Sequence, residues 1–193
     1  MAQILAIGAS ARRGGNSDTI LDTALEVFRE RGDDIEMLYP KKLAMSPCLS
    51  CNACFKTGRC VQDDELTDLY TLFCDVDHIV VATPVYFTSV PGHFKVMIDR
   101  FQCFWARSYV LKAPPQPRRQ GMLMVIGAME RKRYYDYTST VVRTWMASLN
   151  MGCPVERYYM DLDARDDIDH HHEYLDDARA AAREFVDTTE DRD

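Results

Sequence analysis

Four of the seven cysteines in this chain lie within residues 48–60, in the segment SPCLSCNACFKTGRC, with the spacing C-x2-C-x2-C-x5-C. The chain passes from Met1 into an apolar stretch without a basic leader, and it contains no long apolar run. We therefore expect a cytoplasmic protein that does not enter a membrane. Because thiols stay reduced in that compartment, the cysteine group is typical of a metal site or of redox chemistry rather than of structural disulfides.

A second polar group lies in GASARRGGNS, residues 8–17, which lacks the glycine patterns of dinucleotide and nucleoside triphosphate sites. Its hydroxyls, amide and guanidinium can converge with backbone amides on one terminal phosphate at a helix N-terminus. The side chains are those of Ser10, Arg12, Asn16 and Ser17. The turn predicts a mononucleotide site, and we expect Asn16 or Ser17 also to cap the helix; a plain capped turn is the alternative.

A third segment, TPVYFTSVPGHF at residues 83–94, follows an apolar run. A proline followed by aromatic residues makes a rigid loop that can lie along a flat ring and present backbone amides to its polar edge. The alternative is that Tyr86 and Phe87 only cover the edge of the core. His93 begins a helical pattern beside this loop, and we expect a structural role for it, with a substrate contact as the alternative.

Other groups favour plainer roles. The basic run 131–133 predicts a solvated loop or helix start, with a patch for an anionic partner such as a nicotinamide-cofactor phosphate as the alternative. Adjacent histidines at 170–172 point in different directions on a helix, so DHHHEYL predicts a helix start capped by Asp169. The net charge of −7 argues against nucleic-acid binding. We expect small buried hydrophobic residues at Cys74, Cys103 and Cys153.

Short apolar runs must position these groups. The runs 4–8, 79–82 and 122–126 carry no charge, which is typical of strands buried on both faces of a parallel sheet, and 34–39 and 154–160 are plausible outer strands. Between them, apolar residues at helical spacing predict helices around 20–28, 66–73, 92–105, 141–149 and 174–185.

This alternation predicts one doubly wound α/β domain over residues 1–193, with a five-stranded parallel sheet and right-handed crossovers. Two insertions interrupt it. The cysteine-rich segment covers 40–62, and prolines forbid regular structure in 106–120. The polar tail after Phe185 is expected to fray.

GASARRGGNS, the cysteine motif and TPVYFTSVPGHFKVMIDR together resemble the NADPH-dependent FMN reductase family, and specifically its iron-sulfur flavoproteins. The resemblance covers about residues 1–130. It implies a flavodoxin-like fold with strand order 2-1-3-4-5, bound FMN at the point where the strand order reverses, and a homodimer or a tetramer of dimers. It also implies that the cluster of one subunit approaches the flavin of the partner.

The resemblance assigns cofactor contacts residue by residue. The FMN phosphate falls on Ser10, Arg12, Asn16 and Ser17. The flavin ring falls on Thr83, Pro84, Val85, Tyr86 and Phe87. A third contact falls near Gly127, where GAMERKRYY replaces the glycine-rich loop common in the family, and Ala11 stands where relatives usually have proline.

The cysteine spacing resembles the compact motif of these flavoproteins. Three thiolates at x2 spacing can bind three corners of a cubane cluster, and the fourth can complete the ligand set. The predicted [4Fe-4S] ligands are Cys48, Cys51, Cys54 and Cys60. Zinc is one alternative, although zinc sites usually divide their ligands into two distant pairs. Thiols that bind nothing, or that form a reversible disulfide, are the other.

Three functions follow, in order of preference. The first is an FMN-dependent oxidoreductase with a [4Fe-4S] cluster, which takes electrons from NAD(P)H or ferredoxin and passes them to a quinone, oxygen or peroxide. The second is a cluster-free NAD(P)H-dependent FMN or quinone reductase. The third is a non-catalytic redox sensor whose cysteines oxidise and alter a partner interface.

Overall fold

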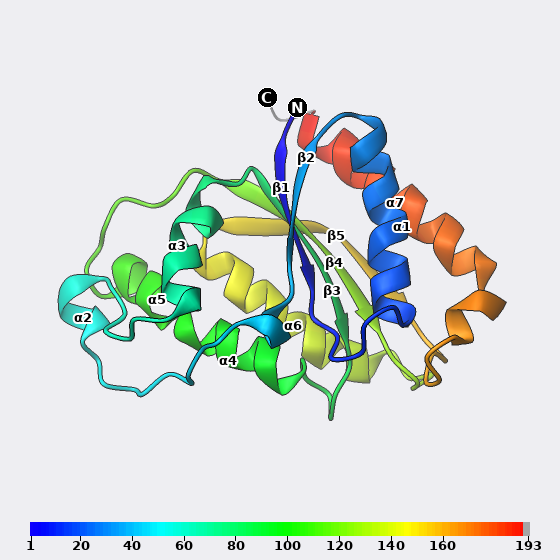
Figure 1. Ribbon diagram of the computed structural model, residues 1–193. Coiled ribbons are helices and arrows are strands. Elements are labelled where there is room, and N and C mark those ends of the chain that lie inside the picture. Colours follow the sequence, from blue (N-terminus) through cyan, green and yellow to red (C-terminus); the bar gives the residue numbers. More distant parts are fainter. Residues whose placement is uncertain (191–193) are drawn as a thin grey trace.

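The computed structural model describes residues 1–190 of the 193-residue chain. The strands are β1 (Gln3–Gly8), β2 (Asp34–Leu38), β3 (His78–Pro84), β4 (Arg119–Ile126) and β5 (Met151–Tyr159). They pair in parallel in the order β2-β1-β3-β4-β5 (Figure 1). The predicted flavodoxin-like, doubly wound α/β architecture is therefore confirmed, including the strand order that the family resemblance implied.

The sheet is buried on both faces because its central strands carry continuous apolar runs between their ends. In β1, Leu5 and Ile7 pack into one core layer, and Ile4 and Ala6 pack into the other. Successive side chains of a strand point to opposite faces of the sheet. A continuous apolar run is thus the sequence that a sheet covered on both sides requires.

Helices form the two outer layers (Figure 1). One face carries α1 (Asn16–Glu30) and α7 (His172–Glu190), which pack against each other. The other face carries α3 (Glu65–Asp75), α4 (Gly92–Arg100), α5 (Gln102–Tyr109) and α6 (Arg133–Ser148). The short helix α2 (Cys54–Thr57) and the 3-10 turns η1 (Pro40–Lys42) and η2 (Asp167–His170) lie in connecting segments.

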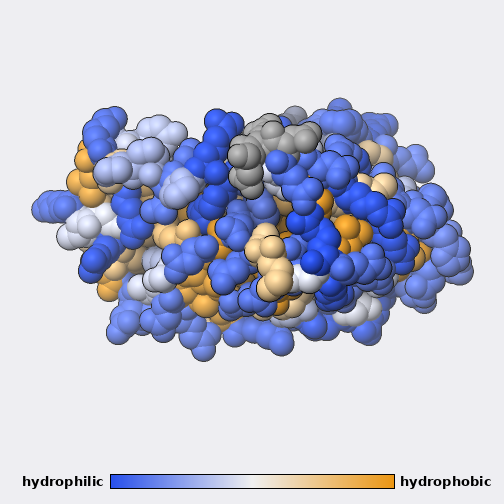
Figure 2. All heavy atoms as spheres, turned by 90° about the horizontal axis from the view of Figure 1, so that it is seen from above, coloured by the Kyte–Doolittle hydropathy of each residue, from blue (hydrophilic) through white to orange (hydrophobic). Residues whose placement is uncertain are grey.

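The two ends of the sheet differ. The carboxyl ends of β1, β3 and β4 lie at the lower edge of Figure 1, whereas Met1 and the end of α7 lie at the opposite edge. Figure 2 views that opposite end, which is largely hydrophilic apart from scattered apolar side chains. In an open α/β sheet, ligands bind beyond the carboxyl ends of the strands, and the predicted phosphate and ring loops are both there.

Two predicted boundaries in the middle of the chain need correction. The expected helix over 92–105 is two helices, because α4 ends at Arg100, Phe101 interrupts it, and α5 continues from Gln102 to Tyr109. The insertion predicted over 106–120 is irregular only between Tyr109 and Arg119, where β4 begins. Its prolines all fall within that shorter stretch.

The C-terminal predictions were partly wrong. Asp169 lies inside η2 rather than at a helix cap, and α7 begins at His172. The expected fraying after Phe185 does not occur up to Glu190, because α7 continues to that residue; the remainder of the tail lies outside the described residues. Between Met1 and Glu190, no helix is both long enough and apolar enough to span a bilayer.

Candidate functional site

The turn between β1 and α1 folds around hydrogen bonds of its own residues. The Arg12 backbone N–H donates to Ser10 Oγ at 3.1 Å, and the Gly14 N–H donates to Asp18 Oδ2 at 2.8 Å. Helix α1 then begins at Asn16 and points its N-terminus at the carboxyl edge of the sheet. The first N–H groups of a helix have no intrahelical partner, and they favour an anion there.

Asn16 does not cap α1, contrary to the prediction. The cap position is Gly15, and no side chain accepts a hydrogen bond there. The Asn16 side chain instead binds the segment after β5, donating from Nδ2 to Ala164 O at 2.7 Å and accepting at Oδ1 from the Ile168 N–H at 3.2 Å. We call this segment, residues 160–168, the strap. Asn16 therefore holds the strap against the turn that begins α1.

Two arginines strengthen the attachment of the strap. Arg12 Nη1 donates to Asp163 O at 2.9 Å. From the strap, Arg165 donates to the carbonyls of Arg13 at 2.7 Å and Gly14 at 3.3 Å. The strap could not be predicted from the sequence, because nothing in its residue types signals a distant loop contact.

A cavity of about 110 Å³ lies where the turn, the ring loop, the end of β4 and the strap meet. It is lined by eight of the ten predicted cofactor residues: Ser10, Arg12, Asn16, Ser17, Pro84, Val85, Tyr86 and Gly127. Leu162, Asp163 and Arg165 of the strap complete the wall. The structure thus brings together residues from four separate parts of the sequence.

Thr83 and Phe87 lie outside this lining. Thr83 is completely buried and its Oγ1 donates to Pro84 O at 3.2 Å, whereas the Phe87 side chain is fully exposed. Tyr86 and Ser89 exchange two backbone hydrogen bonds of 2.8 and 3.0 Å around Phe87 and Thr88, which have φ angles of 49° and 60°. This is the geometry of a tight hairpin turn. A β-branched residue such as Thr88 rarely adopts a left-handed conformation, so the turn is strained.

His93 has the structural role expected of it. Its Nε2 lies 2.9 Å from Ala9 O, and it joins the start of α4 to the end of β1. The ring loop is fixed on its other side by a hydrogen bond of 2.8 Å from the Val85 N–H to Ile126 O. The ring loop is therefore held at both ends of the segment that precedes α4.

Gly127 forms the third side of the cavity. A Cβ atom there would lie 3.1 Å from the Tyr135 hydroxyl oxygen and 3.3 Å from Val85 Cβ, so a side chain at this position would be tightly packed. The Tyr135 hydroxyl lies 2.8 Å from Gly127 O, and burial raises the pKa of Tyr135 to about 12. A neutral phenol thus orients the Gly127 peptide, and a flat ligand can approach its backbone closely.

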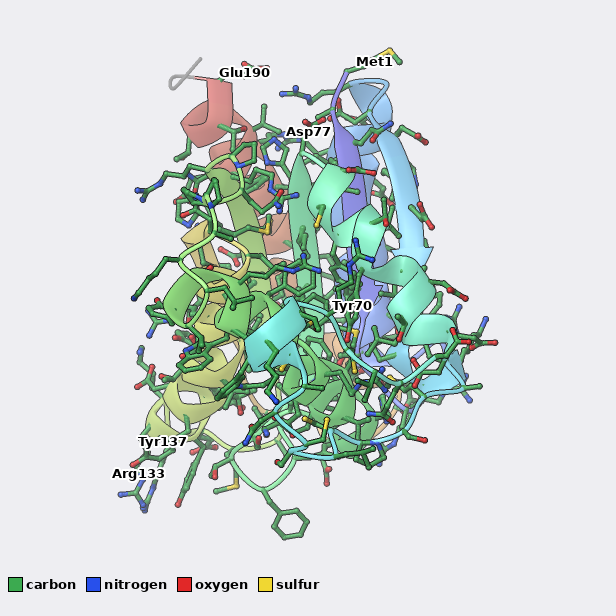
Figure 3. The ribbon with its side chains drawn as sticks, turned by 90° about the vertical axis from the view of Figure 1, so that its left-hand side faces the viewer. Met1, Tyr70, Asp77, Arg133, Tyr137 and Glu190 are labelled. Carbon is green, nitrogen blue, oxygen red and sulfur yellow. The ribbon has the colours of Figure 1, made fainter. Side chains whose placement is uncertain are left out.

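The four clustered cysteines line a second, larger cavity of about 390 Å³. It lies under the segment after β2, which crosses in front of α4 and α5 in Figure 3, with α2 packed on α5. Cys51 is exposed and the other three thiols are half-buried. Cys103 from α5 also lines the cavity, although sequence analysis treated it only as a small core residue.

The backbone of this segment makes two left-handed turns between cysteines. Ser50 has a φ of 50° and Asn52 a φ of 58°, so a turn separates Cys48 from Cys51 and another separates Cys51 from Cys54. Gly58 ends α2 with a φ of 69°, and Arg107 Nε donates to its carbonyl at 2.7 Å. Within the described residues, no hydrogen bond involves the backbone of residues 48–51.

The thiols are neighbours but do not converge on one point. Burial raises the pKa of Cys54, and the charges of Cys48, Cys51 and Cys60 raise it further. No group of three or more His, Cys, Asp or Glu side chains in residues 1–190 is arranged to hold a single metal ion.

Arg100, at the end of α4, joins the cysteine segment to α3. Its side chain is completely buried, and it forms an ion pair of 2.6 Å with Asp64, the residue that caps α3 through the Thr67 N–H. Burial raises the pKa of Asp64, but the hydrogen bond and charge of Arg100 outweigh this effect and lower that pKa to about 2. A hydrogen bond of 2.8 Å from Arg100 to Ser46 O fixes the start of the cysteine segment.

The basic run lies where the sequence suggested. Arg131 and Lys132 are exposed just before α6, and Arg133 begins that helix (Figure 3). Arg133 donates to the hydroxyl of its neighbour Tyr134 at 3.0 Å. The run is a solvated helix start, as expected.

Residues 2–163 match the family model for NADPH-dependent FMN reductase. Over 144 residues the chain is 30% identical to an iron-sulfur flavoprotein of Methanosarcina thermophila, covering 75% of this chain and 72% of that protein. Over 138 residues it is 28% identical to an iron-sulfur flavoprotein of Archaeoglobus fulgidus, covering 70% of this chain and 60% of that one. The chain thus spans about two thirds of the length of these relatives.

Solved structures share the fold. An FMN-dependent NADH-azoreductase of Bacillus anthracis in complex with FMN superposes with a TM-score of 0.67 at 11% identity, covering 95% of this chain and 99% of that one. An NAD(P)H:quinone oxidoreductase of Methanothermobacter marburgensis superposes with a TM-score of 0.66 at 14% identity, covering 95% and 96%. At these identities the likeness concerns the fold alone.

Proposed function

This chain belongs to the NADPH-dependent FMN reductase family, and we propose that it is an FMN-dependent oxidoreductase whose cysteines hold a [4Fe-4S] cluster. An FMN-dependent oxidoreductase follows from the family. The family assignment does not itself include the cluster. The observation that supports the cluster is that a single cavity of about 390 Å³ is lined by all four motif cysteines, Cys48, Cys51, Cys54 and Cys60. The two relatives described above are themselves named iron-sulfur flavoproteins.

The first site fits the phosphate of FMN. Ser10 and Ser17 supply hydroxyls, Arg12 supplies a guanidinium, and the first turn of α1 supplies backbone N–H groups. Asn16 contributes indirectly, because both ends of its amide already bind the strap. In this arrangement the protein fixes the ligand by its anionic end.

The second part of that site fits a flat ring. Pro84, Val85 and Tyr86 form one wall, and the close approach permitted by Gly127 forms the other. Thr83 supports the loop from the core instead of touching a ligand, and Phe87 stands at its exposed tip. We propose that these residues orient the flavin ring and cover one of its faces.

The cysteine spacing favours a cluster over one zinc ion. Zinc sites usually divide their ligands into two distant pairs, whereas these four cysteines lie within residues 48–60. A cubane cluster places its ligands at separated corners, with room between the sulfurs. Left-handed turns at Ser50 and Asn52 allow three cysteines in seven residues to face one cavity.

FMN, when bound, accepts a hydride as an electron pair, whereas an iron-sulfur cluster transfers single electrons. The residues of this chain hold the two groups at fixed positions. We propose NAD(P)H as the donor and a quinone as the acceptor, with ferredoxin and oxygen as alternatives. We further propose a homodimer or tetramer, and a cytoplasmic location in which all seven cysteines stay reduced.

Purification without air, followed by a visible spectrum and an iron assay, tests this proposal. We expect flavin bands, a broad brown absorbance, and about four irons per chain. Flavin with NADPH turnover but without iron would favour the cluster-free reductase instead. Protein that binds no flavin, shows no turnover and cycles its thiols reversibly would support the redox sensor.

A further inference from the structure

The guanidinium of Arg100 has one N–H group that the described residues leave unpaired. Its Nη atoms donate to Ser46 O at 2.8 Å, to the two Asp64 oxygens at 2.6 and 3.1 Å, and to Thr67 Oγ1 at 3.1 Å. Its Nε is buried and has no hydrogen-bond partner. Buried polar groups are nearly always paired in proteins, and an unpaired one is costly.

Arg100 belongs to the wall of the cysteine cavity, and its side chain is 0% exposed. Cys60 lines the same cavity as Arg100. Burial lowers the pKa of Arg100, but the hydrogen bond with Asp64 and the charges of Tyr70 and Cys60 raise it more. The cavity of four thiols therefore has one buried cation at its wall, next to a ligand sulfur.

We propose that Arg100 tunes the cysteine site by donating its Nε–H to the sulfur of Cys60, and so raises the reduction potential of the cluster. This inference depends on the proposed function. Hydrogen bonds to ligand sulfurs and the net charge around a cluster are two means by which a protein sets that potential. Reduction adds one negative charge to the site, and a buried cation stabilises that charge.

Asp64 has the opposite effect. Its carboxylate pairs with Arg100 on the side of the guanidinium away from the unpaired Nε, and it offsets part of the positive charge. A purely structural role for the pair predicts no ordered change in potential. The tuning role predicts that removing Asp64 charge and removing Arg100 charge shift the potential in opposite directions.

The test is a reductive titration of the purified holoprotein, followed by electron paramagnetic resonance of the cluster. Asp64→Asn keeps a good helix cap for α3 and removes the negative charge, so we expect a shift to more positive potential. Adding Arg100→Met in the Asp64→Asn background should shift the potential to more negative values. This double variant replaces the pair together, so it leaves no unpaired buried charge.

Arg59→Met is the matched control, because Arg59 precedes Cys60 but is exposed. Solvent screens its charge, so we expect a smaller shift than for Arg100. Equal shifts from the two arginines, or a negative shift in Asp64→Asn, would overturn the inference. If Asp64→Asn alone fails to fold because Arg100 is left as an unpaired buried charge, the double variant still decides, since it should have a more negative potential than the wild-type protein. Wild-type protein without iron would contradict the proposed function and the inference with it, whereas iron with unchanged potentials contradicts the inference alone.

Discussion

The flavin side and the cysteine side of this molecule are held together in different ways. On the flavin side, the turn after β1 and the strap are joined by hydrogen bonds from Arg12, Asn16 and Arg165. On the cysteine side, residues 48–51 make no backbone hydrogen bond in the described structure, and one buried ion pair, Arg100 with Asp64, anchors the segment. Hydrogen bonds within the protein hold the flavin side in place. The conformation of the cysteine segment depends far more on the group that its thiols bind.

The largest expected effect is a complete loss of iron without any loss of FMN. Cys54→Ala should abolish iron binding, because it removes one of four ligands, and it should leave FMN bound with an unchanged dissociation constant. Iron content and flavin absorbance of the purified variant measure both. Cys103→Ala is the control, since Cys103 lines the same cavity but lies outside the motif and should leave the iron in place. Joint loss of FMN and iron in Cys54→Ala would show that the sites are coupled.

The next largest effect is expected to weaken FMN binding and to leave the cysteine site unchanged. Asn16→Ala removes both strap hydrogen bonds and leaves the Ala164 carbonyl and the Ile168 N–H unpaired. We expect FMN affinity to fall by about 10–100-fold, equivalent to about 1.4–2.8 kcal/mol, with iron content unchanged. Fluorescence titration with FMN measures the loss.

Asn150→Ala provides the control for that loss. It also removes a side-chain hydrogen bond to a backbone carbonyl, but at the far end of the sheet. It should lower stability without changing FMN affinity. An equal affinity loss in both variants would attribute the effect to general destabilisation instead of to the strap.

The strands and most of the predicted cofactor residues could be located from the sequence. The three central strands were predictable, because continuous apolar runs are needed in a sheet covered on both faces, and the two outer strands were expected from less regular runs beside them. Eight predicted cofactor residues meet in one cavity, since the carboxyl ends of parallel strands lie at a common edge. The strand order came from the family resemblance and not from the apolar pattern.

Other features could not be read from residue types. Arg165 contacts a turn about 150 residues earlier in the chain, and no local pattern announces such a contact. Arg100 follows a helical pattern like any solvated arginine, and arginine is seldom fully buried. The break at Phe101 falls inside a continuous helical pattern, so the residue types do not mark it.

A third prediction concerns the stability of the fold at low pH. The pKa of Asp64 is about 2 in the folded protein, below its ordinary value of 3.8, so its pairing with Arg100 stabilises the fold above that ordinary value. The stabilisation is lost as the pH falls toward 2, and it amounts to about 2 kcal/mol. Denaturant unfolding can be compared for cluster-free Cys54→Ala protein with and without Asp64→Asn. The difference in their free energies of unfolding should become smaller between pH 5 and pH 2. A constant difference would contradict the shift.

The smallest expected effect concerns the strained backbone of Thr88 in the ring loop on the flavin side. Thr88 has a φ of 60°, which glycine adopts without strain. Thr88→Gly should raise the free energy of unfolding by up to about 1 kcal/mol, with an unchanged denaturant slope. Lower stability in this variant would mean that the Thr88 side chain contributes more than its backbone strain costs.

Helix α4 begins at Gly92, directly after the ring loop, and ends at Arg100 in the wall of the cysteine cavity. Nine residues at 1.5 Å each make a rigid spacer of about 13 Å. Inserting or deleting a single residue in this helix would also rotate Arg100 by about 100° about the axis. The same element therefore sets both how far apart the ring loop and the cysteine cavity lie and which way the arginine faces, so the loops around it can change more freely than its length.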